Sequence, residues 1–237
     1  MRKDIKAVIF DLDGTLLPME DLVKFMMTYF ELLSKKLSGY GVEAKRFFDA
    51  TMRSMKEMAE NTSKRTNADI FWKYFEEEFG HKEEELADKI EDFYKNEYLG
   101  LKSLTGHNPE IAPAIKELKS RGYRLAVATN PLFPAIALKE RLKWAGVDIN
   151  DFEFITTYED YHSCKPSPNY YKEVAKNLNL SPSEIMMVGN DTSDDMSAVG
   201  AGMKVFLLTD CLINRKGVDI SSYKNGDFEA LRKELLS

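Results

Sequence analysis

The sequence is poor in cysteine and histidine and contains no long apolar run. Cys164 and Cys211 are its two cysteines and there are three histidines, with no spacing that fits a zinc or redox motif. No apolar stretch approaches the roughly 20 residues that a membrane-spanning helix needs. We therefore expect reduced thiols and no membrane partner, and predict a cytoplasmic protein.

A surplus of positive charge is also missing. Asp and Glu number 39 against 33 Lys and Arg, which gives a formal net charge of −6. Nucleic-acid binding depends on surplus Lys and Arg that displace counterions from phosphates, so we expect no nucleic-acid partner. A single phosphate monoester remains compatible with this charge, because it needs only a local positive pocket.

The chain has 237 residues, of which 43% are hydrophobic and 30% charged. This composition is typical of a folded globular protein. The length fits either one large domain or a core with a smaller insert.

Five short apolar runs predict buried strands. They are continuous rather than alternating, which is typical of a parallel sheet covered on both faces. Predicted helices lie between most of them, so the sequence indicates an α/β fold with a Rossmann-like, doubly wound core. The predicted strands are residues 7–10, 124–129, 152–156, 185–188 and 204–208, and the predicted core helices are residues 109–120, 133–144, 168–178 and 195–201.

A long segment without a convincing strand follows the first predicted strand. Met, Phe, Tyr, Lys and Glu recur in it at helical spacing, with breaks at glycines. The predicted helices are residues 19–38, 43–60, 67–79 and 83–98. We predict an α/β core of residues 1–16 and 103–237 and an all-helical cap domain of residues 17–102.

Polar residues follow the predicted strands. Each group has a structural explanation, such as a turn, a helix cap or a solvated loop. However, ligands of an open parallel sheet bind beyond the carboxyl ends of its strands, and one site there explains all four groups. The groups are Asp11 to Thr15, Thr129-Asn130, Lys165 and Gly189 to Asp195.

The residue types of these groups suit phosphoryl transfer. Asp11 and Asp13 repel each other unless a cation or a shared proton relieves them. A carboxylate that attacks a phosphate dianion meets the same repulsion, which a divalent cation and a lysine offset. Phosphoryl transfer depends mostly on positioning and charge neutralisation.

Together the groups resemble the four signature motifs of the haloacid dehalogenase-like hydrolase superfamily. The motifs are DLDGT (11–15), TN (129–130), CKP (164–166) and GNDTSDD (189–195), in the family's order and spacing. The helical insert resembles that family's C1-type cap. The resemblance implies a Mg2+-dependent phosphatase that hydrolyses a small phosphomonoester through an aspartyl-phosphate intermediate.

The resemblance also implies a role for each position. Asp11 would be the nucleophile and Asp13 the general acid and base. The Asp11 carboxylate and the Asp13 backbone carbonyl would hold Mg2+. Thr129 and Asn130 would bind phosphoryl oxygens, and Lys165 would steady both the nucleophile and the phosphoryl group.

The fourth motif departs from the family's usual Gly-Asp, so two registers of metal ligands stay open. We prefer Asp191, supported by Asp195, because this register keeps a charged ligand. The alternative uses Asn190 and Asp194.

Three other activities use similar residues. Dehalogenases of this family lack the second aspartate, so Asp13 argues against one. A phosphomutase shares every core residue and is not excluded, whereas a phospho-accepting receiver module is about half this length and lacks the insert. A small phosphorylated metabolite is the expected partner, and the sequence leaves the oligomeric state open. Cap residues that are candidates for facing the site are Phe25, Met26, Arg53, Lys64 and Arg65.

Overall fold

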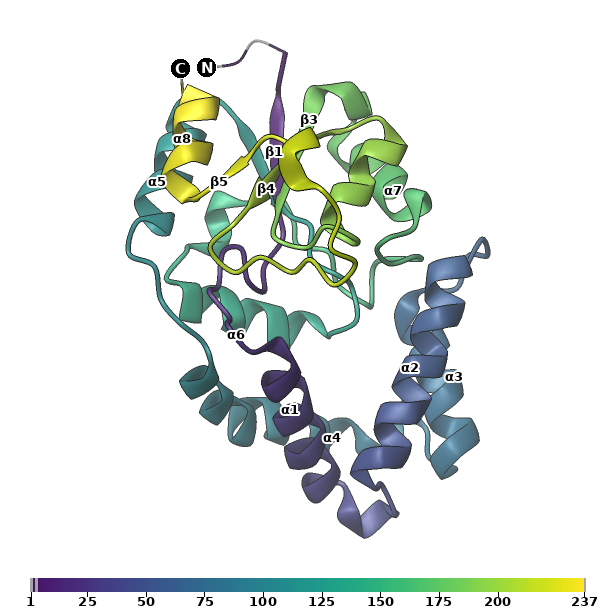
Figure 1. Ribbon diagram of the computed structural model, residues 1–237. Helices are drawn as coiled ribbons and strands as arrows, with labels where there is room; N and C mark the ends of the chain where they lie inside the picture. Colours follow the sequence, from purple (N-terminus) through teal and green to yellow (C-terminus); the bar gives the residue numbers. More distant parts are fainter. Residues whose placement is uncertain (1, 3, 237) are drawn as a thin grey trace.

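The computed structural model describes residues 2 and 4–236, which form a parallel five-stranded sheet with helices on both faces (Figure 1). Val8 in β1 lies opposite Leu125 in β2 on one side and Met186 in β3 on the other. The predicted α/β fold is confirmed. The strands are β1 Ala7–Phe10, β2 Arg124–Val127, β3 Ile185–Gly189, β4 Lys204–Leu208 and β5 Asn225–Gly226, in the spatial order β2-β1-β3-β4-β5.

Different helices cover the two faces of the sheet. Ala7 and Ile9 of β1 belong to the apolar cluster that includes α7 (Pro168–Leu178). The alternate β1 side chains belong to the cluster that includes α5 (Ile111–Ser120) and α8 (Phe228–Leu236). Figure 1 shows α5 and α8 on one side of the sheet and α7 on the other. Because both faces of β1 are buried, its sequence is continuously apolar.

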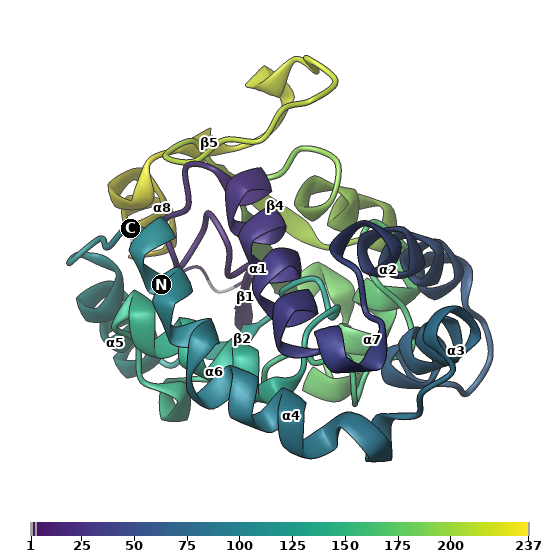
Figure 2. The same ribbon diagram turned by 90° about the horizontal axis from the view of Figure 1, so that it is seen from below.

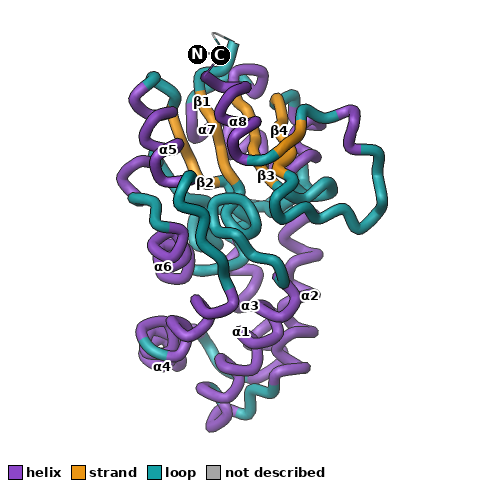
Figure 3. Tube along the Cα trace, turned by 60° about the vertical axis from the view of Figure 1, so that its left-hand side comes forward, coloured by secondary structure: helices purple, strands orange, loops and turns teal. Residues whose placement is uncertain are grey.

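The insert between β1 and α5 is helical and lies beyond the carboxyl ends of the strands (Figure 3). Viewed from below, its helices lie in front of the sheet (Figure 2). The α2–α3 pair and the α1–α4 pair stand on opposite sides of this part of the molecule (Figure 1). The insert contains α1 Leu22–Lys36, α2 Ala44–Glu60, α3 Asn67–Phe79, α4 Glu83–Lys95 and the 3-10 segment η2 Glu97–Leu104.

Capping residues explain where these helices begin. Thr66 and Asp69 form a reciprocal capping box, which starts α3 at the predicted residue. The Asp21 side chain accepts a hydrogen bond of 2.9 Å from the Lys24 backbone N–H, so α1 starts after Asp21 rather than at residue 19 as predicted.

Three core predictions need correction. The strand predicted at residues 124–129 ends at Val127. Residues 152–156 lie along β2, but Ile155 makes only an isolated bridge to Val127 and no strand forms. The predicted helix at residues 195–201 is a 3-10 helix, which ends at Gly202 in the left-handed conformation. Two further elements, β5 and α8, follow the last predicted strand and were not predicted. The Asn-Gly pair of β5 is typical of a turn, so it does not indicate a strand.

We predict that Ile9→Ala lowers the free energy of unfolding by about 2–5 kcal/mol, because the fully buried side chain leaves a cavity in the central sheet. Urea denaturation measures the change. Leu99→Ala is the matched control, since Leu99 is 42% exposed and its truncation is expected to change the value by no more than about 0.5 kcal/mol. Equal losses in the two variants would contradict the assignment of Ile9 to the core.

Candidate active site

A cavity of about 680 Å3 lies between the carboxyl edge of the sheet and the helical insert. Apolar side chains of the insert form one wall, and the strand-end residues form the other. All the core residues that the sequence predicts for catalysis, phosphate binding or metal binding line this one cavity. They are Asp11, Asp13, Thr129, Asn130, Lys165, Asn190, Asp191, Asp194 and Asp195.

A buried lysine joins two of these carboxylates. The Lys165 ammonium donates to Asp11 Oδ1 at 2.8 Å and to Asp195 Oδ1 at 2.6 Å, and its side chain is 1% exposed. Burial raises the pKa of Asp11, and the Lys165 charge opposes this rise. Burial alone would lower the pKa of Lys165, but the charges of Asp11 and Asp195 raise it well above its ordinary value. Lys165 is therefore a fixed cation beside Asp11.

Two glycines allow the loops of the site to approach each other. Gly14 has φ +87°, and a Cβ there would lie 2.2 Å from the amide nitrogen of Asn190. A Cβ on Gly189 would lie 2.1 Å from Asp195 Oδ2. A side chain at either position would push the fourth motif away from the end of β1.

The loop after β3 organises itself around Asp191. Asp191 Oδ1 accepts the backbone N–H groups of Ser193 at 2.7 Å and Asp194 at 3.1 Å. Its own N–H donates to Asp195 Oδ2 at 2.9 Å. Burial, reinforced by the charge of Asp191, raises the pKa of Asp194 to about 6. Burial also raises the pKa of Asp195, against the effect of Lys165.

The Asn190 side chain is engaged with other parts of the protein. Its Oδ1 accepts the Thr15 hydroxyl at 3.2 Å, and its Nδ2 donates to the Cys211 carbonyl at 2.6 Å. Asn190 therefore links the first motif to the segment after β4.

Hydrogen bonds to the backbone fix the segment that follows β2. The Thr129 carbonyl accepts hydroxyl groups of Thr156 at 2.6 Å and Tyr170 at 2.8 Å. Asn130 Oδ1 accepts the Lys165 backbone N–H at 3.2 Å, so the second motif is bonded directly to the third.

Asp13 has a partner that the sequence analysis missed. Its Oδ2 forms an ion pair with Arg141 from α6 (Ala135–Ala145), and the guanidinium lies 4.3 Å from the Phe133 ring centroid. The Arg141 side chain is 1% exposed, and Asp13 Oδ1 has no hydrogen-bond partner among the described residues. A signal was present, because residue 141 falls on the apolar stripe of its helix, between Leu138 and Leu142.

Arg215 is a second residue that sequence reasoning missed. Its Nη1 donates to Asp191 Oδ2 at 2.9 Å, although its side chain is 62% exposed. It lies in the connection between β4 and β5, outside every recognised motif, so no sequence pattern indicated it.

The donor chemistry of this wall suits a hard cation. No three His, Cys, Asp or Glu side chains within residues 2 and 4–236 form a group arranged as metal ligands. Mg2+ commonly takes only one or two carboxylates, with water and substrate phosphate completing its shell. Among the described lining residues, five aspartates face two cations, Lys165 and Arg215. Asp11 and Asp191 fit such an ion, because the wall has a surplus of negative charge.

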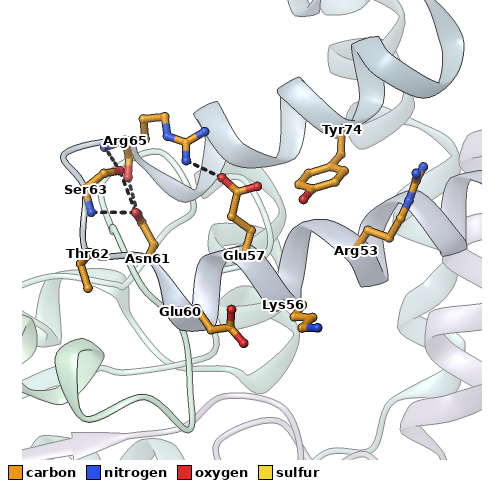
Figure 4. Close-up of a pocket in the computed structure, with 9 residues that line it drawn as sticks. All are labelled: Arg53, Lys56, Glu57, Glu60, Asn61, Thr62, Ser63, Arg65 and Tyr74. Carbon is orange, nitrogen blue, oxygen red and sulfur yellow. Dashed lines mark hydrogen bonds and ion pairs between the residues drawn. The ribbon is translucent and has the colours of Figure 1, made fainter.

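The candidate cap residues divide between two regions. Met26 lines the large cavity, whereas Phe25 is buried with its ring near Arg141. Arg53 and Arg65 line a separate pocket of about 490 Å3 on α2 and α3, where Arg65 pairs with Glu57 (Figure 4). Lys64 is exposed beside that pocket.

Comparison with known proteins agrees with the motifs. A model of the haloacid dehalogenase-like hydrolase family matches residues 5–202. The chain therefore belongs to this family and is a hydrolase. It is 26% identical over 203 residues to the pyrophosphatase PpaX of Bacillus velezensis, which covers 85% of this chain and 82% of that protein. It is also 26% identical over 204 residues to the phosphorylated carbohydrates phosphatase of Thermotoga maritima, which covers 84% and 83%.

Solved structures share the fold. A HAD phosphatase from Thermococcus onnurineus matches with a TM-score of 0.58 and 25% identity over 98% of both chains. The defluorinating L-2-haloacid dehalogenase Rha0230 matches with a TM-score of 0.60 and 17% identity, over 98% of this chain and 96% of that one. Within residues 2 and 4–236, no helix has the length and apolar character to cross a bilayer.

We predict that Lys165→Met destabilises the metal-free protein by about 3–5 kcal/mol near neutral pH, because two buried carboxylates lose their cation. Without Lys165 the main effect that opposes the burial-induced rise in the pKa values of Asp11 and Asp195 is lost. The folded state then binds protons more tightly than the unfolded state, so the loss grows as the pH rises from about 5 to about 8.

Urea unfolding in EDTA at both pH values measures this loss. Lys64→Met removes an exposed lysine and is the control, with no pH-dependent loss expected. A Lys165→Met loss that is independent of pH would contradict the electrostatic explanation.

Proposed function

We propose that this hydrolase is a Mg2+-dependent phosphatase that cleaves a phosphomonoester through an aspartyl phosphate on Asp11. The main support is the position of Asp11, which directly follows β1 and lines the cavity with one oxygen held by Lys165. Relatives named as phosphatases, which match over most of the chain, add further support.

The proposed reaction has two displacements at phosphorus. The free oxygen of the Asp11 carboxylate attacks the phosphorus atom, and the bond to the leaving oxygen breaks. Lys165 offsets the repulsion between the carboxylate and the phosphoryl group. Thr129 and Asn130 bind the phosphoryl oxygens from the end of β2. Water then attacks the phosphorus atom, which releases inorganic phosphate and restores Asp11.

Asp13 serves both displacements as acid and base. Its carboxyl group donates a proton to the leaving oxygen, and its carboxylate then takes a proton from the attacking water. Both steps require its side chain to turn from Arg141 toward the substrate. A halide leaving group needs no proton, so the presence of Asp13 favours phosphate ester cleavage over dehalogenation.

Asp11, the Asp13 backbone carbonyl and Asp191 would hold Mg2+, with Asp195 in support. Bound Mg2+ supplies charge neutralisation for the phosphate. The Asp191–Asp195 register is favoured over Asn190 and Asp194, because the amide of Asn190 already bonds elsewhere in the protein.

The same proposal gives the insert a role. Residues 17–102 form a helical cap over a core of residues 1–16 and 103–237, and the cap selects a small phosphorylated metabolite from its side of the cavity. A cytoplasmic location fits the two free cysteines.

We expect the purified protein to release inorganic phosphate repeatedly from p-nitrophenyl phosphate when Mg2+ is present. EDTA should stop the release, and added Mg2+ should restore it. Asp11→Asn should reduce kcat at least about a thousandfold, because the amide cannot attack phosphorus, while circular dichroism stays that of wild type. Wild-type activity in this variant would rule out Asp11 as the nucleophile. A receiver module would instead hold one phosphate per chain, and a phosphomutase would transfer it within a sugar.

We expect Asp13→Asn to show a burst of p-nitrophenolate close to one per enzyme, followed by very slow turnover. This leaving group departs without a proton, so Asp11 is still phosphorylated, whereas the water lacks its base. Rapid-mixing absorbance measures the burst. The Asp11→Asn, Asp13→Asn double variant is the control and should show none. A burst in the double variant would exclude Asp11 as the phosphorylated residue.

A further inference from the structure

The wall of the cavity opposite the strand ends is apolar. It is formed by α1, α2, α3 and α4, and no charged residue of the insert lines it within the described part of the chain. Methionines and aromatic rings predominate there, and flexible methionines adapt to ligands of variable shape. Representative lining residues are Met26, Met27, Phe48, Met52, Phe71 and Trp72.

The few polar groups on this wall are already engaged within the protein. The Tyr29 and Tyr94 hydroxyls bond to each other at 2.9 Å. The Thr51 hydroxyl donates to a backbone carbonyl of its own helix at 2.9 Å, and Trp72 Nε1 lies 3.4 Å from the Tyr158 hydroxyl. The hydroxyl groups of a sugar phosphate would therefore lose water here and find few remaining hydrogen-bond partners, which costs free energy.

Part of this apolar wall is exposed to solvent. Met27 is 49% exposed and Met52 is 46% exposed, and Val23 and Phe48 beside them are also exposed. All four line the cavity. Exposed apolar side chains that line the same cavity as a polar site are typical of a ligand-binding groove.

We infer that the substrate is a phosphomonoester with an extended apolar body, such as an alkyl phosphate, rather than a sugar phosphate. This inference rests on the proposed function, which places the phosphate at the strand ends. The apolar body lies along α1 and α2. The cavity volume falls within the range of about 300–1,000 Å3 that is usual for small-molecule pockets, and is larger than a phosphate group alone requires.

A homologous series of n-alkyl phosphates from ethyl to octyl tests the inference. We expect kcat/KM to rise about fourfold for each added methylene until the cavity is filled, which corresponds to about 0.8 kcal/mol per buried methylene. Glycerol phosphate and a hexose monophosphate should be poorer substrates than butyl phosphate. Values that stay flat along the series, or a preference for the hexose monophosphate, would overturn the inference.

Substitutions on the exposed part of the apolar wall test whether this surface causes the gain in kcat/KM with chain length. Met27→Gln combined with Met52→Gln should reduce the gain between ethyl and octyl phosphate by about tenfold. Leu99→Gln is the matched control, because Leu99 is 42% exposed but does not line the cavity, and it should keep the wild-type gain. Equal losses for ethyl and octyl phosphate in the methionine variant would instead assign this surface to packing of the insert helices on each other, and would overturn the inference.

Binding of n-alkyl phosphonates separates this inference from the proposed function. These compounds have no ester bond to cleave, so calorimetric Kd values do not depend on turnover. The Kd should fall about fourfold for each methylene. The proposed function alone fails if binding follows this trend but no phosphate ester is hydrolysed. The inference alone fails if p-nitrophenyl phosphate is hydrolysed but neither kcat/KM nor Kd changes with chain length.

Discussion

The structure of the site depends on one buried ion triplet, in which Lys165 bonds to both Asp11 and Asp195. Each carboxylate would be strongly disfavoured at its depth without the lysine, and the lysine would be disfavoured without them. The three residues come from the end of β1, the loop before α7 and the segment after β3. Their pairing therefore joins three distant parts of the chain and sets the position of Asp11, the proposed nucleophile.

Much of this arrangement could be predicted from the sequence. Polar residues directly after apolar strands indicate the ligand-binding edge of a parallel sheet, and each of the four groups chosen on that basis contributes residues that line the cavity. Arg141 and Arg215 were missed for different reasons. Arg141 lies on an apolar helix stripe, so the sequence shows a charge there, but it does not show that Asp13 is its ion-pair partner. Arg215 reaches Asp191 across 24 positions, through a connection without regular structure. Such contacts depend on tertiary folding, which spacing does not encode.

The cavity combines two chemically different walls. The strand ends contribute fixed charges and hydrogen bonds, which suit a phosphoryl group and its transfer. The insert contributes apolar side chains, whose polar neighbours are already bonded to each other. Under the proposed function, the sheet sets the reaction type and the helices set the selectivity. Sequence motifs identify the residues at the strand ends, but the orientation of the insert side chains became evident only from the fold.

Gly189 shows how the site limits the chain that forms it. A glycine within a buried strand weakens a sheet, by about 0.5–1 kcal/mol relative to alanine. Here the Asp195 carboxylate occupies the space where a Cβ would lie. Replacing Gly189 with a residue that favours strands would therefore displace Asp195 from Lys165, so glycine is retained at this position. The sheet is therefore less stable than it would be with alanine at position 189, and this loss of stability accompanies the position of Asp195 in the site.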